Sequence, residues 1–500
     1  MFARRPENGY AGWDRPGASA MVASSGRARL FGFVAGIAML VAGIFAPPPP
    51  GLPPEALRVA GVAGLMAAWW ITEVIPVAAT GLLPVVLLPL LGVVPIRNAA
   101  APYADPIVFL FLGGFMLGIA TQRWALHRRL GLRIIAAVGT SPGRLSAGLL
   151  LATAFLSMWV SNTATSLMML PIAISVLALF DGRFADDHSA ENLGVLLMLS
   201  VCYGASIGGL ATIIGTPPNA LLVGHLAREY GIQIGFAQWM MLGVPLSAAL
   251  LAVTWVILTR LHPVTLLRAG GLDEIIRHDL QQQGALSSAE IRVILVLLVA
   301  ALGWVFRPLL SQHLPAINDT IIAVGAGIVL FLLPSGSPQG GRLLVWDDMK
   351  SVPWGVLVLF GGGLSLASAI DSSGLAKWLA DAMSILSAWP VILILATAVV
   401  SMIFLTELTS NTASAATFLP FAAAVALGIG ISPLLLTVPM ALAASCAFML
   451  PVATPPNAIV YASGRVTIPQ MARAGFWLNL AAAVLIVVAS YPAGLYLFAR

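Results

Sequence analysis

The sequence predicts an all-α polytopic membrane protein with about eleven transmembrane helices and two re-entrant hairpins, arranged as two inverted repeats. Three observations carry this prediction. Hydrophobic residues make up 59% of the 500 residues and charged residues only 9%, whereas a soluble domain carries about a quarter charged residues. The apolar stretches run for ~17–25 residues, the length of a membrane-spanning helix rather than of a barrel strand. Short motifs also recur in both halves of the chain, in the same order.

Apolar stretches of spanning length occur throughout the chain. The expected spans are residues 30–46, 57–75, 77–96, 106–121, 193–227, 237–261, 291–308, 319–334, 355–371, 431–462 and 470–499. The fifth and the tenth are too long for a plain crossing and contain Pro-Pro, so we expect both to be broken in the middle. The two hairpins cover 143–180 and 387–427.

The distribution of lysine and arginine orients these spans. With a cytoplasmic N-terminus, and with each hairpin returning to its own side, nineteen Lys and Arg fall inside and six outside. This asymmetry follows the positive-inside rule, and treating either hairpin as a single crossing would destroy it. We therefore expect a bacterial inner-membrane protein with its C-terminus outside, and we attribute the net charge of +5 to orientation rather than to nucleic-acid binding.

The same pattern divides the chain into five parts. They are a disordered cytoplasmic tail (1–29), a first transmembrane helix (30–56), a first repeat (57–261), a cytoplasmic linker (262–290) and a second repeat (291–500). Cys202 and Cys446 both lie in apolar segments and are interpreted as core residues, without a disulfide or metal role.

Three motifs are paired between the halves. They are Ser161-Asn162-Thr163 with Ser410-Asn411-Thr412, Phe111-Leu112-Gly113-Gly114 with Phe360-Gly361-Gly362-Gly363, and Gly215-Thr216-Pro217-Pro218-Asn219 with Ala453-Thr454-Pro455-Pro456-Asn457. Gly114 precedes Asn162 by 48 residues, and Gly363 precedes Asn411 by 48. Each half holds five spans, an odd number, so the repeats are expected to have opposite topology. Inverted repeats place the binding site between them, near the bilayer midplane.

The Ser-Asn-Thr motifs lie at the hairpin tips, where a second helix begins. Free backbone N–H groups and the positive end of the helix dipole suit an anionic group there, and Asn and Thr add neutral donors. Two such tips facing each other suit a molecule with an anionic group at each end. Helix capping by Ser, Asn and Thr is the alternative for a single tip, but it does not explain both tips at equal spacing.

The Pro-Pro breaks suit a cation. Proline cannot donate a hydrogen bond, so the carbonyls of Ile213 and Ile214, and likewise those of Pro451 and Val452, lose their helical partners. Freed carbonyls at the end of a half-helix are ligands for a hard cation such as sodium. The hydroxyls of Ser157 and Thr406, each five residues before the motif asparagine, could complete one sodium site in each half. An ordinary proline kink is the alternative.

Charge supports coupling between anion and cation. Apart from Arg144 at a hairpin's foot, the motif-bearing segments hold one charge, Glu407, four residues before Asn411 and expected on the same helical face. No basic residue could neutralise a dianion at the midplane, where an uncompensated charge is costly. Bound cations would meet that need. Glu407 would support a cation or a proton, or serve as a structural hydrogen-bond partner.

Five charged or titratable residues near span ends are interpreted as interfacial and structural: Glu73, Arg123, His127, Arg128 and Arg129.

From about Trp69 to the C-terminus, the chain resembles the divalent-anion/sodium symporter family, which includes di- and tricarboxylate transporters. The resemblance rests on the paired motifs, on Trp70-Ile71-Thr72-Glu73 and on Phe111 to Gly118. It implies a homodimer in which a transport domain moves against a scaffold as an elevator. It also implies a sodium-coupled symporter of a C4 dicarboxylate such as succinate, malate or fumarate, with no organic cofactor and no enzymatic activity.

The resemblance implies substrate contacts from Asn162, Thr163, Asn411 and Thr412. Beside them at the hairpin tips and the breaks, we also expect contacts from Ser161, Ser410, Thr216, Pro217, Thr454 and Pro455. Sodium is expected near Ser157, Ser161, Asn162, Gly215, Thr406, Thr409, Asn411 and Ala453. Val160 occupies the first-half position that matches Thr409, so the two cation sites should differ.

Other functions were weighed against this prediction. On the same fold, the protein could exchange dicarboxylates without sodium, or carry sulfate or citrate with sodium. An intramembrane hydrolase would need a nucleophile and base, or metal ligands, at membrane depth, yet the six histidines are all expected in loops or near span ends. A channel is disfavoured because broken helices in inverted repeats serve alternating access.

Overall fold

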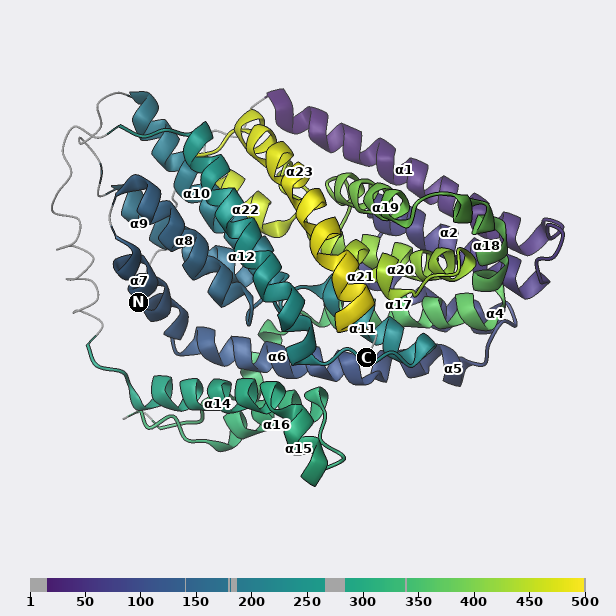
Figure 1. Cartoon of the computed structure of the whole chain (residues 1–500), viewed down its shortest axis with the longest axis horizontal. Helices are drawn as coiled ribbons and strands as arrows, with labels where there is room; N and C mark the ends of the chain where they lie inside the picture. Colours follow the sequence, from purple (N-terminus) through teal and green to yellow (C-terminus); the bar gives the residue numbers. More distant parts are fainter. Residues whose placement is uncertain are drawn as a thin grey trace, which may run out of the picture.

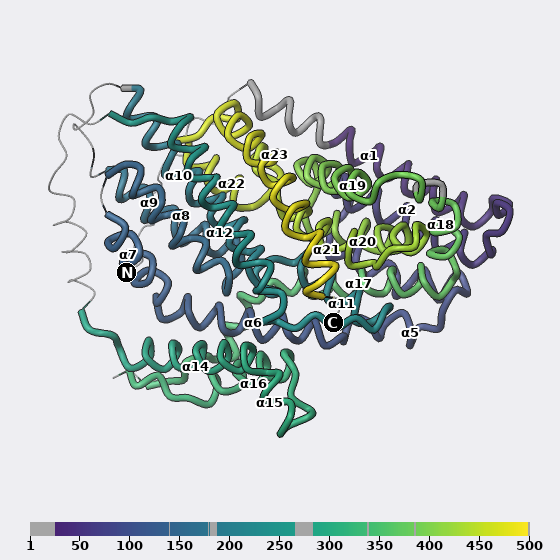
Figure 2. Tube along the Cα trace, viewed as in Figure 1, coloured from purple at the N-terminus to yellow at the C-terminus, as the bar shows by residue number. Residues whose placement is uncertain are grey.

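A computed structural model describes residues 16–139, 141–178, 180, 187–265, 284–337 and 340–498. The described residues form helices and loops, with one isolated bridge between Pro334 and Arg342 (Figures 1 and 2). Within these ranges, eight helices are long and apolar enough to cross a membrane. The prediction of an all-helical protein with several spanning helices is therefore confirmed.

The chain begins with a long pair of helices. Helix α1 (Pro16–Phe45) lies along α2 (Pro54–Thr72), and a Cβ atom on Gly43 would come within 2.7 Å of the Gly61 Cα atom. Small residues allow such close approach of membrane helices. Because α1 already starts at Pro16, the predicted disordered tail is wrong for residues 16–29, where alanines favour helix; residues 1–15 lie outside the described ranges.

The predicted span at 77–96 is not one helix. It forms α3 (Val77–Thr80) and α4 (Leu83–Leu90), separated at Gly81. Tyr103 Oη donates to Gly81 O, and a Cβ on Gly362 would lie 2.1 Å from the same oxygen. Close packing against the later helix that carries Gly362 therefore accompanies a break that apolar length alone did not reveal.

The rest of the first half contains a hairpin flanked by longer helices. The elements are α5 (Ile96–Ala100), a short 3-10 helix (Ala101–Ala104), α6 (Pro106–Arg123), α7 (Leu126–Val138), the hairpin α8 (Pro142–Ser157) and α9 (Asn162–Ala178), the broken pair α10 (Asp187–Gly209) and α11 (Pro217–Tyr230), and α12 (Phe236–Leu261). The predicted break before Pro217 is confirmed. Proline at the first helical position fits because the N–H it lacks would be unpaired there.

The second half follows the same order. Its elements are α14 (Ser288–Val305), α15 (Arg307–His313), α16 (Asp319–Leu332), a 3-10 helix (Trp346–Ser351), α17 (Trp354–Ser372), α18 (Leu375–Met383), a 3-10 helix (Ser384–Ala388), the hairpin α19 (Val391–Thr406) and α20 (Asn411–Gly428), the broken pair α21 (Leu434–Ala443) and α22 (Pro455–Ala462), α23 (Ile468–Pro492) and a π-helical turn (Ala493–Leu497). The second predicted break is thus confirmed as well.

The halves pack into one another reciprocally. Helix α11 of the first half contacts α20 and α21 of the second, whereas α22 of the second half contacts α9 and α10 of the first. The hairpin α8–α9 lies toward the left of Figure 1 and α19–α20 toward the right, with α12 and α23 crossing in front. This arrangement brings the ends of the broken helices into the middle of the protein.

Two short amphipathic helices, α7 and α18, precede the hairpins and are held at equivalent positions. Arg129 lies 15 residues after Gly114, and Trp378 lies 15 residues after Gly363. Arg129 Nε donates to Glu290 Oε1 at 2.7 Å, and Nη1 donates to Gly284 O at 2.8 Å, just before α14. Trp378 Nε1 donates to Pro50 O at 3.2 Å, just before α2. Each helix is therefore fixed to the segment that precedes the other half's first helix.

Candidate functional site

At the first hairpin tip, oxygen atoms converge on the Asn162 side chain. Ser157 Oγ lies 2.7 Å from the Asn162 carboxamide oxygen and 2.7 Å from Ala205 O. The same carboxamide atom is 3.1 Å from Ala205 O and 3.2 Å from Gly215 O. Rotating the carboxamide by 180° would turn Nδ2 toward these oxygens and satisfy them. If Oδ1 faces these oxygens instead, the single proton of the Ser157 hydroxyl must serve several acceptors. A bound cation would complete such an arrangement.

The second tip repeats this arrangement. Thr406 Oγ1 donates to Asn411 Oδ1 at 2.8 Å and lies 3.0 Å from Ala444 O. Because a hydroxyl has a single proton, Thr406 can donate a full hydrogen bond to only one of these two acceptors. We name the two groups the first oxygen cluster (Ser157, Asn162, Ala205 and Gly215) and the second oxygen cluster (Thr406, Asn411 and Ala444). Each cluster lies where a hairpin helix begins and a broken helix ends.

The helix breaks are held open by the last residue of the Thr-Pro-Pro-Asn motifs. Asn219 Nδ2 donates to Thr212 O at 2.8 Å and to Gly209 O at 3.3 Å. Asn457 Nδ2 donates to Leu450 O at 3.0 Å and Ala447 O at 3.1 Å, the equivalent carbonyls. Both asparagines are fully buried. Their hydrogen bonds fix the conformation of the loops that carry the clusters, and their side chains are not accessible to a substrate.

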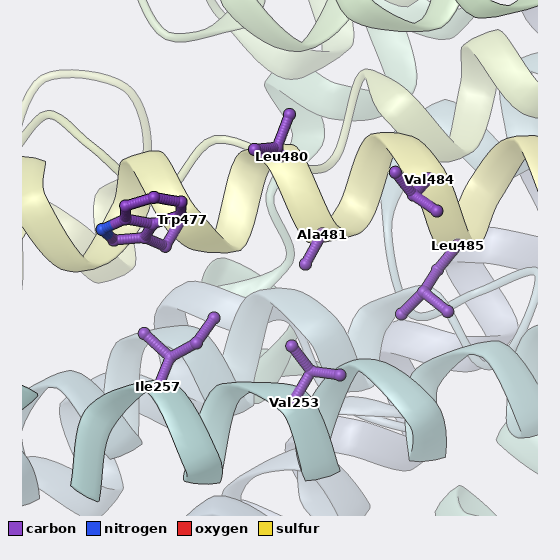
Figure 3. Close-up of a pocket in the computed structure, with 7 residues that line it drawn as sticks. All are labelled: Val253, Ile257, Trp477, Leu480, Ala481, Val484 and Leu485. Atoms are coloured by element: carbon purple, nitrogen blue, oxygen red, sulfur yellow. The ribbon is translucent and has the colours of Figure 1, made fainter. Parts of the chain in front are cut away.

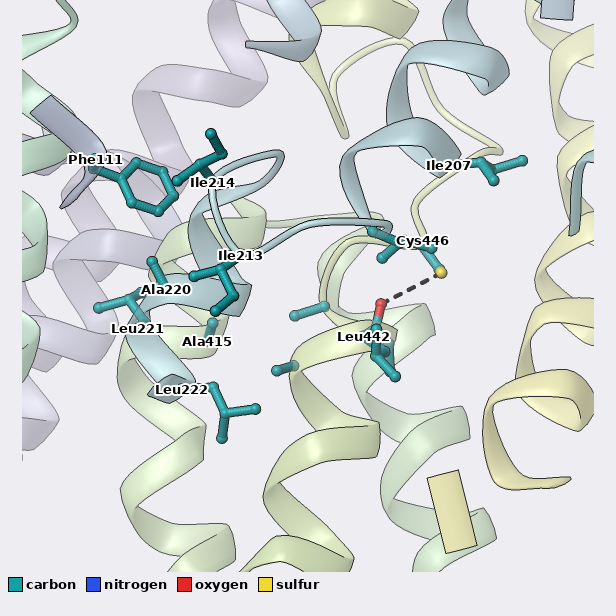
Figure 4. Packing of buried hydrophobic residues seen from close by; sticks show 14 of the residues in the cluster. Phe111, Ile207, Ile213, Ile214, Ala220, Leu221, Leu222, Ala415, Leu442 and Cys446 are labelled. Atoms are coloured by element: carbon teal, nitrogen blue, oxygen red, sulfur yellow. Dashed lines mark hydrogen bonds between the residues drawn. The ribbon is translucent and has the colours of Figure 1, made fainter. Parts of the chain in front are cut away.

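The two breaks meet at the centre of the protein. Thr216 Oγ1 lies 3.2 Å from Ser445 Oγ, across the two halves. Apolar side chains enclose the loops, and Figure 4 shows Ile214 beside Phe111 and Cys446 donating to Leu442 O. A Cβ on Gly114 would lie 3.2 Å from Ile214 Cδ1, so this glycine of the first Phe-Leu-Gly-Gly motif leaves room for the loop.

The structure gathers most of the predicted cation residues but not all of their side chains. The Ser161 hydroxyl accepts from Ala164 N at 3.3 Å and so caps α9. The Thr409 hydroxyl lies 2.5 Å from Ser414 Oγ and is not in the second cluster. Ala453 N donates to Leu450 O at 3.2 Å, and no described hydrogen bond links Ala453 to Asn411.

The carbonyls in the clusters also differ from those expected. Sequence reasoning singled out Ile213 and Ile214, and Pro451 and Val452, because proline frees them. The structure instead brings Ala205 O and Ala444 O to the motif hydroxyls. The usable signal was a repeated Ala-Ser pair, Ala205-Ser206 and Ala444-Ser445, near the end of each broken helix.

The expected substrate contacts differ in accessibility. The Asn162 and Asn411 side chains are half-buried, as are Ser161, Thr163 and Ser410. Thr412 is 9% exposed, and Thr216 and Thr454 are buried. Pro217 is half-buried and Pro455 is exposed. The two asparagines therefore combine access with a place in an oxygen cluster.

Glu407 has a structural position. It follows α19, whereas Asn411 opens α20, so the expectation of a shared helical face is wrong. Its carboxylate accepts from the backbone N–H groups of Phe448, Met449 and Leu450 at 2.7–3.1 Å. Asn479 Nδ2 donates to it at 2.7 Å. These four donors make it the anchor of the loop between α21 and α22, the structural alternative that the sequence had left open.

We expect Glu407→Gln to lower the free energy of unfolding by about 3 kcal/mol. The new NH2 group would face N–H donors in a buried site, where the carboxylate oxygen had accepted from them. Thermal unfolding in detergent measures this. Met158 occupies the equivalent first-half position, where its backbone carbonyl accepts from Thr212 Oγ1 at 2.6 Å. Met158→Leu keeps that carbonyl and is the matched control, with an expected change below about 1.5 kcal/mol. Equal melting temperatures for Glu407→Gln and the wild type would contradict this role.

One histidine departs from its expected place near a span end. His225 lies within α11 and is 4% exposed, with its ring edge-on to Tyr230. Among the described residues there is no group of three or more His, Cys, Asp and Glu side chains placed to hold a metal.

Comparisons with known proteins agree with this geometry. The family described as sodium:sulfate symporter transmembrane region matches residues 27–498. A sodium-dependent dicarboxylate transporter of Staphylococcus saprophyticus is 40% identical over 473 residues, covering 93% of this chain and 91% of that protein. The Staphylococcus aureus transporter of the same name is 41% identical, covering 89% of this chain and 87% of that protein.

Solved structures support the fold. The Alcanivorax borkumensis YdaH transporter superposes with a TM-score of 0.52 at 17% identity, covering 86% of this chain and 97% of that one. Neisseria gonorrhoeae MtrF superposes with a TM-score of 0.54 at 10% identity, covering 94% of each. The fold is thus that of a multi-pass membrane protein, and the family match and the two staphylococcal relatives show that it is a transporter. The chain belongs to the sodium:sulfate symporter family.

Proposed function

We propose that this protein is a secondary transporter that couples sodium to the uptake of a C4 dicarboxylate such as succinate, malate or fumarate. The observation that carries the proposal is the pair of oxygen clusters, in which a hydroxyl, the carboxamide of a motif asparagine and a backbone carbonyl meet at each hairpin tip. The names of the two staphylococcal relatives, each matched over most of its length, support the same choice of cation and substrate.

Sodium would bind at the two oxygen clusters. It is a hard cation that takes carbonyl, amide and hydroxyl oxygens, which are the atoms gathered there. The Asn162 carboxamide can serve two states: Nδ2 toward Ala205 O and Gly215 O when no ion is present, and Oδ1 toward the ion when it binds. Gly215 would contribute its carbonyl, and Ser161, Thr409 and Ala453 would contribute only through their backbones.

The dianion would bind between the hairpin tips. Helices α9 and α20 begin at Asn162 and Asn411, so their free N–H groups and dipoles are available to one carboxylate each. Thr163 and Thr412 follow in the first turns, and Thr216-Pro217 and Thr454-Pro455 open the facing half-helices. Glu407, the acidic side chain that follows α19 beside the second tip, already accepts from four donors. Sodium would therefore supply the compensating charge.

The motion would be that of an elevator built from two inverted repeats, 57–261 and 291–500. The equivalent hydrogen bonds of Asn219 and Asn457, and the reciprocal packing of α11 and α22, support this symmetry. Fixed helices α7 and α18 would join the moving hairpins to a scaffold. We further propose a homodimer, with the N-terminus and the linker 262–290 in the cytoplasm and the C-terminus outside.

The test is dicarboxylate uptake into proteoliposomes with external sodium replaced by choline. We expect uptake to fall to background without sodium, because the charge of the dianion would then be uncompensated between the hairpin tips. If more than two sodium ions accompany each dianion, an inside-negative potential should also drive uptake, by ~2.3 kcal/mol per 100 mV for each net charge.

Two outcomes would change the proposal. Full uptake or counterflow in choline would favour sodium-independent dicarboxylate exchange. Sodium-driven uptake of sulfate or citrate, with none of succinate, would keep the coupling and replace the substrate. Competition by unlabelled succinate, malate, fumarate, citrate and sulfate in the same assay distinguishes these cases.

A further inference from the structure

An apolar groove runs between α12 and α23 on the outside of the protein (Figure 3). It has a volume of about 420 Å³, and its walls are formed by Val253 and Ile257 on one side and Trp477, Leu480 and Val484 on the other. Trp477 and Val484 are 51% and 57% exposed. Both helices are long and apolar enough to span a membrane, so an exposed apolar groove between them suits acyl chains.

One end of this groove is basic. Each of its two helices carries a single charged residue, Arg260 on α12 and Arg473 on α23. Arg260 lies three residues after Ile257, and Arg473 lies four residues before Trp477, so each arginine continues the groove-lining face of its helix. Both side chains are exposed, and neither forms an ion pair within the described ranges.

The helices run antiparallel, which places the two arginines at the same end. At the opposite end, Gln238 Nε2 of α12 donates to Leu497 O, which follows α23, at 2.7 Å. At the basic end, burial and then the charge of Arg473 lower the pKa of His262, the residue after α12. Glu191 also lies near His262, where its negative charge opposes this lowering of the pKa. Its carboxylate accepts from Gln470 Nε2 at 2.7 Å.

We propose that this groove binds an anionic phospholipid, with its phosphate at Arg260 and Arg473 and an acyl chain along Val253, Ile257, Leu480 and Val484. A basic site between membrane helices at the cytoplasmic surface suits an anionic head group. The charge separates this occupant from a neutral lipid, which would need no arginine. It also separates it from an apolar helix of a second subunit, which would cover the groove but leave both guanidinium groups unpaired.

Such a lipid would join the two halves of the protein. Helix α12 packs on α8 and α10 of the first half, whereas α23 packs on α19 and α21 of the second. A bound acyl chain would fill the seam between them at the membrane surface, so the lipid should raise the melting temperature of the whole protein.

The experiment compares the wild type with Arg260→Gln/Arg473→Gln and with Ala481→Trp, which fills the groove. Melting temperatures are measured in micelles titrated with phosphatidylglycerol or with phosphatidylcholine. We expect phosphatidylglycerol to stabilise the wild type, and the double variant to need about thirtyfold more of it for the same shift. Ala481→Trp should lose the shift while keeping its arginines.

The control is Arg128→Gln, which removes an exposed arginine on α7, away from the groove. Its response to phosphatidylglycerol should match that of the wild type. An equal response of the double variant and the wild type, or equal stabilisation by phosphatidylcholine, would overturn the proposal. Unchanged melting of all variants in micelles without added lipid separates lost lipid binding from misfolding. If the double variant melts early, Arg260→Gln and Arg473→Gln are tested singly, each with a smaller expected loss.

Discussion

Replacing Asn411 or Asn162 with alanine is expected to reduce sodium-driven dicarboxylate uptake by about a hundredfold or more. Each asparagine is half-buried at the start of a hairpin helix and has its carboxamide within 2.8 Å of a buried hydroxyl, Thr406 Oγ1 or Ser157 Oγ. Each is thus placed to serve a sodium ion and the anion at once. Alanine removes the carboxamide oxygen that each cluster would offer to sodium and the amide group that would face the anion.

The measurement is initial uptake into proteoliposomes at saturating sodium, with folding checked by gel filtration and thermal unfolding. Asn98→Ala removes an exposed asparagine from α5 and should transport like the wild type. Thr406→Val keeps the shape of the side chain but removes the hydroxyl, and we expect it to raise the half-saturating sodium concentration about tenfold. Wild-type uptake by a folded Asn162→Ala or Asn411→Ala protein would remove these residues from the site.

The features predicted correctly from the sequence are those that depend on residue type. Proline fixes where α11 and α22 begin, because it lacks an N–H and is favoured in the first helical turn. Long apolar stretches predict α6, α12, α17 and α23, since a bilayer requires them. The recurring Ser-Asn-Thr motif placed both hairpin turns, which the structure forms immediately before Asn162 and Asn411.

The features that were missed depend on backbone atoms and on packing at a distance. Any residue has a carbonyl, so the repeated Ala-Ser pairs mark Ala205 and Ala444 as equivalent positions but do not reveal that their oxygens reach a cluster. Glu407 finds its donors at Phe448 to Leu450, about forty residues away, in the next break. The split between α3 and α4 at Gly81 lies against Gly362 of α17 and Tyr103, contacts that an apolar count cannot include.

The two breaks differ in how tightly their loops close, and this difference leads to the last prediction. A Cβ on Gly215 would lie 2.4 Å from Gly209 O, and a Cβ on Gly209 would lie 2.7 Å from Asn162 Oδ1. The atoms nearest to Gly215 are all backbone atoms of Gly209, and Gly209 O already accepts from Asn219 Nδ2 at 3.3 Å, so they cannot move away easily. Alanine occupies the equivalent second-half positions, at 447 and 453. The first oxygen cluster is therefore the tighter of the two.

Gly215→Ala is expected to displace the Gly215 carbonyl from the first oxygen cluster and to reduce sodium-driven uptake by about a hundredfold, the effect of roughly 1 Å of misplacement in a preorganised site. Ala453→Gly, the matched change in the other half, adds no atom and should keep uptake within about threefold of the wild type, because an added glycine costs only ~1 kcal/mol of backbone freedom. A sodium titration of uptake measures both variants. Normal sodium dependence in a folded Gly215→Ala protein would show that this carbonyl does not hold the ion. If both variants fold but lose sodium-driven uptake, the flexibility of the loop would control transport, rather than the space at Gly215.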